Sequence, residues 1–403
     1  NRREHWNETV ARYFDFMQNH LKDKHNYELT KELREELQSA VTNREVVPSM
    51  RSIMTAGEAL ERQNIAGYNC SYLPIDDPKA FDEAMYILLC GTGVGFSVEQ
   101  QYVGKLPEIP EKLYESETVI HVKDSKEGWA KSLRQLIALL YAGEVPKWDV
   151  SAVRPAGARL KTFGGRASGP EPLVELFKYV VTKFKAASGK RLTSLDAHDI
   201  LCKIGEVVVV GGVRRSTMIS LSELSDDRMA HAKAGNWWDG NGQRALANNS
   251  AVYTTKPSVG QFMREWSSIY ESHSGERGIF SRYASDLQAS KSGRRELGQE
   301  WGTNPCSEII LRPYQFCNLS SVIVRNADTA DVLRNKIRLA TILGTFQATM
   351  TNFPYLRKIW QKNTEDERLL GVSMTGILDN PLLNNPDDPE LPALLESLRN
   401  EAI

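Results

Sequence analysis

The stretch from residue 68 to residue 98 constrains the fold more than any other part of the chain. Tyr68-Asn-Cys-Ser-Tyr-Leu predicts a strand, and residues 77–90 predict a helix. Gly91-Thr-Gly-Val-Gly then predicts a glycine turn that enters a second strand. A strand–helix–strand order is typical of a mainly parallel sheet, so we expect an α/β protein.

The same patterns continue along the chain without an internal repeat or an obvious linker. We therefore expect one α/β barrel-like domain that carries a helical layer at its N-terminus. The predicted helices cover residues 6–21, 29–41, 129–141, 171–184, 196–205 and 330–350. The predicted later strands cover residues 206–210, 216–221, 308–311, 320–324 and 370–374.

Charge and composition exclude several classes of function. The net charge is −1, with Lys and Arg spread along the chain, so we expect no nucleic-acid partner. The apolar runs fall far short of the roughly 20 residues that span a bilayer, so we expect a cytoplasmic protein without membrane contact. Five cysteines without a CxxC pair or a His/Cys cluster indicate neither a disulfide framework nor a metal site.

Asn304-Pro-Cys-Ser-Glu is the segment that points most directly to chemistry. Pro305 disfavours helix at Asn304, and the apolar run after Glu308 starts a strand. If the backbone is extended, Cys306 and Glu308 point the same way and can address one substrate. In the alternative interpretation, Cys306 is a small buried hydrophobic residue and Glu308 a surface residue.

Several motifs in the same order resemble those of ribonucleotide reductases. They are Tyr68-Asn-Cys-Ser-Tyr, Gly91-Thr-Gly-Val-Gly, Val210-Gly-Gly-Val-Arg-Arg-Ser, Asn304-Pro-Cys-Ser-Glu and Phe316-Cys-Asn-Leu-Ser. The resemblance runs from about Pro48 to Gly376 and is greatest to adenosylcobalamin-dependent (class II) members and their phage relatives. It implies a ten-stranded catalytic α/β barrel over residues 46–403, incomplete at its C-terminus, with effector loops around residues 150–216. The helical pattern before it predicts an N-terminal helical layer over residues 1–45.

The resemblance also implies an oxidoreductase that makes deoxyribonucleotides from ribonucleoside di- or triphosphates by a thiyl-radical mechanism. Cys306 matches the cysteine that becomes the radical, Glu308 the carboxylate that takes the 3′-hydroxyl proton, and Asn304 the amide that binds the substrate. Cys70 and Cys317 match the pair that becomes a disulfide and is reduced by thioredoxin or glutaredoxin. The two remaining cysteines, at positions 90 and 202, match none of these roles and are interpreted as structural.

Further residues are assigned to nucleotides by resemblance alone. Those expected at the substrate are Ser49, Gly91, Thr92, Gly93 and Arg214, of which the last would read the substrate base. Those expected at a deoxynucleoside triphosphate effector are Asp77, Arg154, Arg159 and Arg166. Taken without the family, the glycines indicate a tight turn and the arginines indicate solvated surface charges.

The chain also departs from the family pattern. It ends soon after Gly371-Val-Ser-Met-Thr-Gly, and it lacks a later Pro-Ser-Gly-Thr turn, a C-terminal cysteine pair and an ATP-cone. We therefore expect a second polypeptide to complete the barrel, or a truncated form of a longer protein. Asp196-Ala-His-Asp-Ile-Leu superficially matches an Asp-x-His-x-x-Gly cobalamin signature, but Leu201 replaces the glycine and helix capping is the preferred interpretation.

Three functions stay open at this point. The first is a class II reductase that uses adenosylcobalamin, with a homodimer as a possible assembly. The second is a class I catalytic subunit, whose radical comes from a ferritin-like metal-containing partner and which binds no radical cofactor itself. The third is an incomplete or split nucleotide-binding fragment that is inactive alone.

Overall fold

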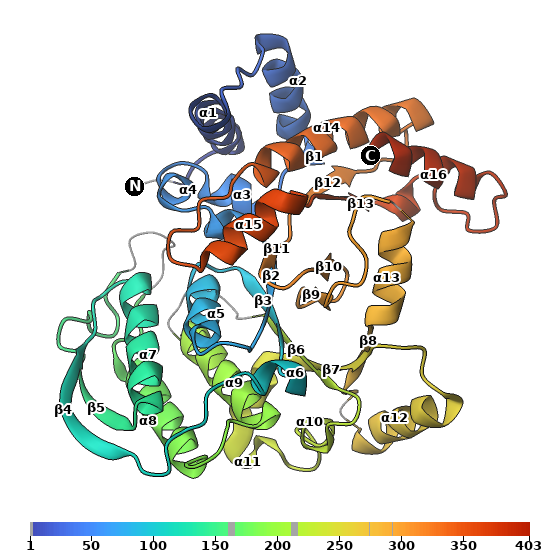
Figure 1. Ribbon diagram of the computed structural model, residues 1–403. Coiled ribbons are helices and arrows are strands. Elements are labelled where there is room, and N and C mark those ends of the chain that lie inside the picture. The colour runs from blue at the N-terminus through green and yellow to red at the C-terminus, as the bar shows by residue number, and fades with distance from the viewer. Residues whose placement is uncertain (1–2, 160–165, 211–216, 274, 292) are drawn as a thin grey trace. The chain divides into compact units, whose positions relative to one another are not determined.

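The computed structural model describes residues 3–159, 166–210, 217–273, 275–291 and 293–403, which form two compact units. One unit combines residues 1–69 with residues 316–403, and the other is the continuous segment 70–315. Figure 1 labels the helices and strands of both. Within the described residues, no helix is both long enough and apolar enough to cross a membrane.

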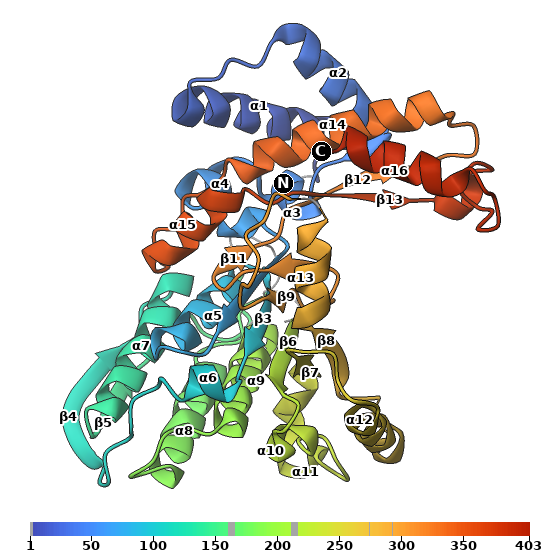
Figure 2. The ribbon, with the colours of Figure 1, turned by 45° about the vertical axis from the view of Figure 1, so that its right-hand side comes forward.

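A parallel sheet forms the centre of the continuous unit (Figure 2). Its neighbouring strands are, in order, β2 (Cys70–Pro74), β3 (Gly93–Ser97), β6 (Met218–Glu223), β7 (Ala247–Tyr253) and β8 (Gly278–Ser281). The register places Cys70 opposite Gly93 and Gly95 opposite Ile219. The helix α5 (Lys79–Leu89) connects β2 to β3, so the predicted strand–helix–strand unit is confirmed.

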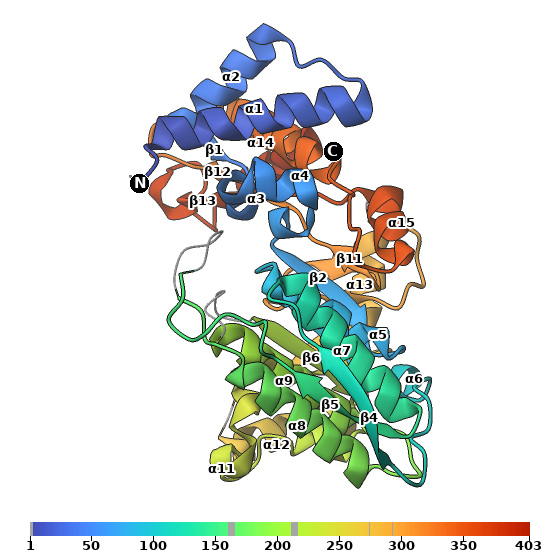
Figure 3. The ribbon, with the colours of Figure 1, turned by 90° about the vertical axis from the view of Figure 1, so that its left-hand side faces the viewer.

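A smaller parallel pair, β4 (Tyr114–His121) and β5 (Glu144–Asp149), lies apart from this sheet in the same unit. Figure 3 shows the helices α7 (Lys126–Tyr141) and α8 (Glu171–Ala186) beside this pair. Both helices were predicted, the second from its apolar face, and Leu173, Phe177 and Phe184 of α8 are fully buried. The remaining elements of the unit are α6 (Gln100–Val103), α9 (Ser194–Val210), α10 (Asp227–Ala230), α11 (Trp238–Asn241), η2 (Gly242–Leu246), α12 (Val259–Ser272), α13 (Arg282–Ser290), β9 (Gly302–Thr303) and β10 (Ile310–Leu311).

The discontinuous unit is built around a three-stranded sheet in which β12 (Leu319–Ile323) is central. The strand β1 (Val46–Val47) pairs with it antiparallel, and β13 (Gly371–Thr375) pairs with it parallel. The apolar residues predicted to face the core from the first helix, such as Tyr13, Phe14 and Met17, are fully buried. The helical elements are α1 (Trp6–His25), α2 (Lys31–Thr42), α3 (Met50–Thr55), α4 (Glu58–Arg62), η1 (Ile65–Gly67), α14 (Ala330–Ala348), α15 (Lys358–Glu367), η3 (Ile377–Asp379) and α16 (Leu391–Glu401). The strand β11 (Gln315–Phe316) lies where the chain passes from one unit to the other.

Two predictions about the fold need correction. Residues 206–210 are not a strand but the last turns of α9, where Val207 and Val208 are buried and Val209 and Val210 are exposed. Burial of one side of a helix decided the local structure against the strand preference of valine. The described residues also form no closed barrel, because their strands belong to separate sheets. A mixed α/β fold is what the structure has.

Candidate functional site

The segment that carries Cys306 is a short hairpin, which we call the Cys306 hairpin (residues 302–311). Its arms are β9 and β10, paired antiparallel with Thr303 opposite Ile310. Asn304 organises the turn between them. Its carbonyl oxygen accepts a hydrogen bond from the Ser307 amide at 2.9 Å, and its side-chain oxygen accepts one from the Ile309 amide at 3.0 Å. The fully buried Asn304 thus fixes the loop around the cysteine.

The backbone between Cys306 and Glu308 is not extended. Ser307 has a φ of 65°, in the left-handed region, so strand alternation does not set the two side chains on one face as expected. Both side chains are nevertheless exposed at the tip of the hairpin. Partial burial, then the Glu308 carboxylate and then Cys70, raise the pKa of the Cys306 thiol above its ordinary value. At neutral pH this sulfur therefore keeps its proton.

Cys70, at the start of β2, belongs to the same site. The Asn304 side-chain amide donates a hydrogen bond to the Cys70 sulfur at 3.9 Å. A Cβ atom on Gly93 would lie 3.4 Å from that sulfur and 3.0 Å from the Pro305 ring. The structure thus brings together Asn304, Cys306 and Cys70 and places Gly93 next to Cys70 and Pro305; the catalytic roles of the three residues stay predictions.

The glycine motif serves a close approach of two backbones. A Cβ atom on Gly95 would lie 1.9 Å from the carbonyl oxygen of Thr303, so the hairpin rests directly on β3. Gly91 has a φ of 83° and makes the turn into that strand. Thr92 is buried, and its amide donates to the Ile87 carbonyl at 3.2 Å. The motif therefore supports the hairpin, and a substrate contact by these residues stays a prediction.

Two of the predicted residues lie in the discontinuous unit. Ser49 precedes α3, is buried, and donates a hydrogen bond from its hydroxyl to the Asn69 side-chain oxygen. Cys317 directly follows β11 and is fully buried. Nothing in their surroundings identifies a ligand, so their roles stay predictions.

The predicted effector residues fall on two loops of the continuous unit. Asp77 accepts a hydrogen bond from the Lys79 amide at 2.8 Å at the start of α5. Arg159 and Arg166 form an isolated antiparallel bridge, and Arg154 donates to Asp124 at 2.8 Å. These contacts give the loop internal partners without revealing an effector. Arg214 lies outside the described residues.

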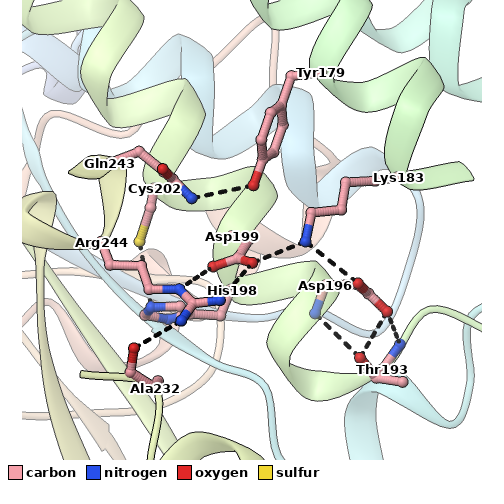
Figure 4. Close-up of polar contacts among 10 residues, drawn as sticks. All are labelled: Tyr179, Lys183, Thr193, Asp196, His198, Asp199, Cys202, Ala232, Gln243 and Arg244. Carbon is pink, nitrogen blue, oxygen red and sulfur yellow. Dashed lines mark hydrogen bonds and ion pairs between the residues drawn. The ribbon is translucent and has the colours of Figure 1, made fainter. Parts of the chain in front are cut away.

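The segment that superficially matched a cobalamin signature forms a helix cap (Figure 4), which was the preferred interpretation of the sequence. The Thr193 hydroxyl and amide donate to the Asp196 carboxylate at 2.6 and 3.1 Å, and the Asp196 amide donates to the Thr193 oxygen at 3.2 Å. His198 is fully buried, with its Nε2 atom 3.4 Å from the Cys202 sulfur. Burial lowers the pKa of His198 to about 3 and raises that of Cys202. Both side chains are part of the core.

Figure 4 also shows an ionic cluster that the sequence did not reveal. Asp199 of α9 is fully buried and accepts hydrogen bonds from Arg244 at 2.7 and 2.9 Å and from Lys183 at 2.8 Å. Arg244 follows Asp199 by 45 positions, so no local spacing could have indicated the pair. Among the residues that the structure describes, no group of His, Cys, Asp or Glu side chains is arranged to hold a metal ion.

Comparison with known proteins first shows which class of proteins shares this fold. Residues 103–183, which include β4, α7, β5 and most of α8, match the insertion domain of B12-dependent ribonucleotide reductase. A crystal structure of a B12-dependent (class II) ribonucleotide reductase superimposes with a TM-score of 0.77 at 24% identity, covering 93% of this chain and 60% of that one. The class Id ribonucleotide reductase alpha subunit of Actinobacillus ureae gives a TM-score of 0.54 at 11% identity, covering 97% and 62%. The fold is thus that of class II ribonucleotide reductases.

Sequence comparison then identifies individual relatives within this class. The adenosylcobalamin-dependent ribonucleoside-triphosphate reductase of Lactobacillus gasseri is 27% identical over 94% of this chain and 59% of its own length. That of Lactobacillus helveticus is 28% identical with the same coverage. A protein of Mycobacterium phage D29, provisionally named as an adenosylcobalamin-dependent ribonucleoside-triphosphate reductase, is 28% identical over 99% of this chain and 65% of its own length. The resemblance to class II ribonucleotide reductases and their phage relatives is confirmed, and the chain spans about 59% of the length of the first two relatives.

Proposed function

We propose that this chain is the catalytic part of an adenosylcobalamin-dependent ribonucleotide reductase, which reduces ribonucleoside triphosphates to 2′-deoxyribonucleotides. The observation that carries the proposal is the Cys306 hairpin, whose exposed thiol and neighbouring carboxylate share one site with a second thiol, that of Cys70 in β2. The names of the Lactobacillus relatives support a triphosphate rather than a diphosphate substrate.

The proposal assigns one role to each residue of the site. The protonated Cys306 sulfur gives up a hydrogen atom, and the resulting thiyl radical removes the 3′-hydrogen of the ribose. Glu308 takes the proton of the 3′-hydroxyl, and Asn304 hydrogen-bonds the substrate. Cys70 and Cys317 lose two hydrogen atoms to form a disulfide as the 2′-hydroxyl leaves as water, and the 3′-hydrogen returns from Cys306.

The residues present fit a radical cofactor that abstracts from sulfur. When bound, adenosylcobalamin supplies the radical that takes the hydrogen atom from the Cys306 thiol. An exposed and protonated sulfur at the tip of a turn suits that transfer. His198 cannot serve as a cobalt ligand without leaving the core, so this chain offers the cofactor no Asp-x-His-x-x-Gly histidine. The match of residues 103–183 to the insertion domain of B12-dependent ribonucleotide reductase favours a class II enzyme over a class I subunit with a ferritin-like partner.

Several finer assignments belong to the same proposal. In the complete protein the strands described above would form part of a ten-stranded barrel. The loop with Arg154, Arg159 and Arg166, together with Asp77, would bind a deoxynucleoside triphosphate effector, and Arg214 would read the substrate base. Ser49 and residues 91–93 would line the substrate pocket. Thioredoxin or glutaredoxin would reduce the disulfide.

The test is the variant Cys306→Ser in the complete protein, with adenosylcobalamin, effector and reductant present. A serine hydroxyl holds its hydrogen too strongly to give it up to the radical, so deoxynucleotide formation and cofactor-dependent hydrogen exchange should vanish, while effector binding persists. Cys90→Ala is the control, because Cys90 is a buried thiol at the end of α5 to which no catalytic role is assigned. Turnover that survives in Cys306→Ser would refute the proposed function.

A further inference from the structure

The Cys306 hairpin is too short to hold its own geometry. Each arm, β9 and β10, is a strand of two residues. A two-stranded ribbon is marginally stable in water even when it is longer, so side chains must hold this one in place. The position of the Cys306 sulfur therefore depends on contacts made outside the turn.

The first arm is fixed at Trp301, the residue before β9. Trp301 is fully buried, and its indole nitrogen donates to the Asp286 carboxylate at 2.6 Å. Its carbonyl oxygen accepts a hydrogen bond from Arg282 at 3.0 Å, and Arg282 is itself held by an ion pair with Glu99 at 2.8 Å. Trp301 is thus a rigid anchor at one end of the hairpin.

Arg295 connects this anchor to the second arm. Its guanidinium carbon lies 4.4 Å from the centre of the Trp301 ring, which is the distance of a close cation–π contact. The same guanidinium donates to the carbonyl oxygen of Ile310, in β10, at 2.8 Å. It also reaches the Gln315 side-chain oxygen at 3.4 Å, which accepts the Arg312 amide at 2.9 Å. One half-buried side chain therefore joins Trp301, the residue before the first arm, to the second arm of the hairpin.

We infer that Arg295 is a positioning residue that clasps Trp301, at the start of the Cys306 hairpin, to the second arm, β10, and so sets where the reactive sulfur lies. This inference rests on the proposed function of Cys306. A planar guanidinium can stack on a ring and donate in its own plane at the same time, which a lysine ammonium cannot do. Loss of the clasp should leave binding of the nucleotide intact and misplace the sulfur that attacks it.

The experiment compares Arg295→Ala and Arg295→Lys with the wild type in the complete protein. Without any cofactor, amide hydrogen exchange of peptides covering residues 300–312 should rise at least about ten-fold in Arg295→Ala, while exchange in β6 and β7 stays unchanged. With cofactor and substrate, kcat should fall about 10- to 100-fold and KM should change less than about two-fold, since small misplacements cost rate. Arg295→Lys should recover part of both losses. Arg228→Ala, an exposed arginine on α10, is the matched control and should match the wild type.

Each outcome decides a separate point. Unchanged exchange in the hairpin of Arg295→Ala would overturn the clasp, whatever the activity does. If hydrogen exchange rises in the whole protein in Arg295→Ala, the result for the milder variant Arg295→Lys is used instead. A rise in exchange in Arg295→Lys that is not confined to the hairpin would also overturn the proposed clasp. Turnover in Cys306→Ser would remove the catalytic role of the sulfur while leaving the exchange result intact, so the two failures are distinguishable.

Discussion

At the residue scale, the protonation of the Cys306 sulfur is what the site controls. A thiolate has no hydrogen atom to give, so a sulfur that serves as a hydrogen-atom donor must stay protonated at working pH. Partial burial and the nearby Glu308 carboxylate both favour the neutral thiol, and a second thiol at Cys70 acts in the same direction. The carboxylate thus acts as a negative charge toward the sulfur, beside the role of base toward the substrate that we propose for it.

This gives the first of three predictions. The rate at which iodoacetamide alkylates Cys306 should rise with pH, with a midpoint above the ordinary thiol value of about 8.5. Glu308→Gln should shift the midpoint down, because the negative charge that opposes the thiolate is gone. Alkylation of the Cys306 peptide is followed by mass spectrometry over a pH series. An unshifted midpoint in Glu308→Gln would show that the carboxylate does not act on the sulfur.

The residues of this site could be named from the sequence, but their arrangement could not. Local motifs identified Asn304, Cys306 and Cys70, and the structure brings these three together. The turn was missed because Ser307 adopts a left-handed backbone that its residue type does not favour. Arg295 was missed because its contacts with Trp301 and Ile310 arise from tertiary packing and not from spacing.

At the scale of elements, buried ion pairs of Asp199 connect α9 to its neighbours. Asp199 is fully buried between Arg244 and Lys183, which come from η2 and α8. Removing one partner of a buried pair leaves the others unpaired in a medium of low dielectric constant, which costs about 3–5 kcal/mol. The cluster therefore ties three elements together only while all its members are present.

The second prediction follows from this cluster. Asp199→Asn should lower the free energy of unfolding by about 3 kcal/mol at pH 7, measured by urea denaturation. Glu175→Gln on α8 is the matched control. Its carboxylate pairs with Lys178 at 2.9 Å, but both side chains are exposed, so no measurable change is expected. Equal effects of the two changes would contradict a special role for the buried cluster.

The pH dependence of the same variant has a defined sign. Burial alone raises the pKa of Asp199, but hydrogen bonds from Arg244 and Lys183 outweigh it and hold the pKa below its ordinary value. A carboxylate with a lowered folded-state pKa stabilises the protein above its unfolded pKa, near 4, and loses that contribution as pH falls further. The difference in stability between wild type and Asp199→Asn should therefore shrink as pH falls below about 4.

Helices and strands were predicted correctly from the sequence where one hydrophobic pattern dominated the segment. Helices with a single apolar face, such as α1 and α8, were found because burial of that face is periodic. Residues 206–210 failed because four adjacent valines carry no helical period and favour strand in isolation. The strand predicted at 308–311 is only Ile310–Leu311, because the turn around Ser307 takes up its first residues.

At the scale of the whole molecule, family motifs lie in both units, but no pattern in the sequence indicated where the chain divides into them. The discontinuous unit is made of residues far apart in the chain, and only tertiary contacts join them. The resemblance is confirmed by relatives that match 94% or more of the chain, whereas the ten-stranded barrel stays a proposal for the complete protein. The predicted boundary after residue 45 stays a prediction as well.

The third prediction concerns the redox cycle. In the proposed reaction, each turnover removes one oxygen atom from the ribose as water and needs two electrons, which a dithiol supplies when it becomes a disulfide. If Cys70 and Cys317 are that dithiol, air oxidation should yield a Cys70–Cys317 bridge by peptide mapping. Cys70→Ser and Cys317→Ser should each block repeated turnover with thioredoxin, whereas Cys90→Ala should turn over normally. A bridge that contains Cys90 or Cys202 instead would assign the electrons to a different pair, even if Cys306 proves essential.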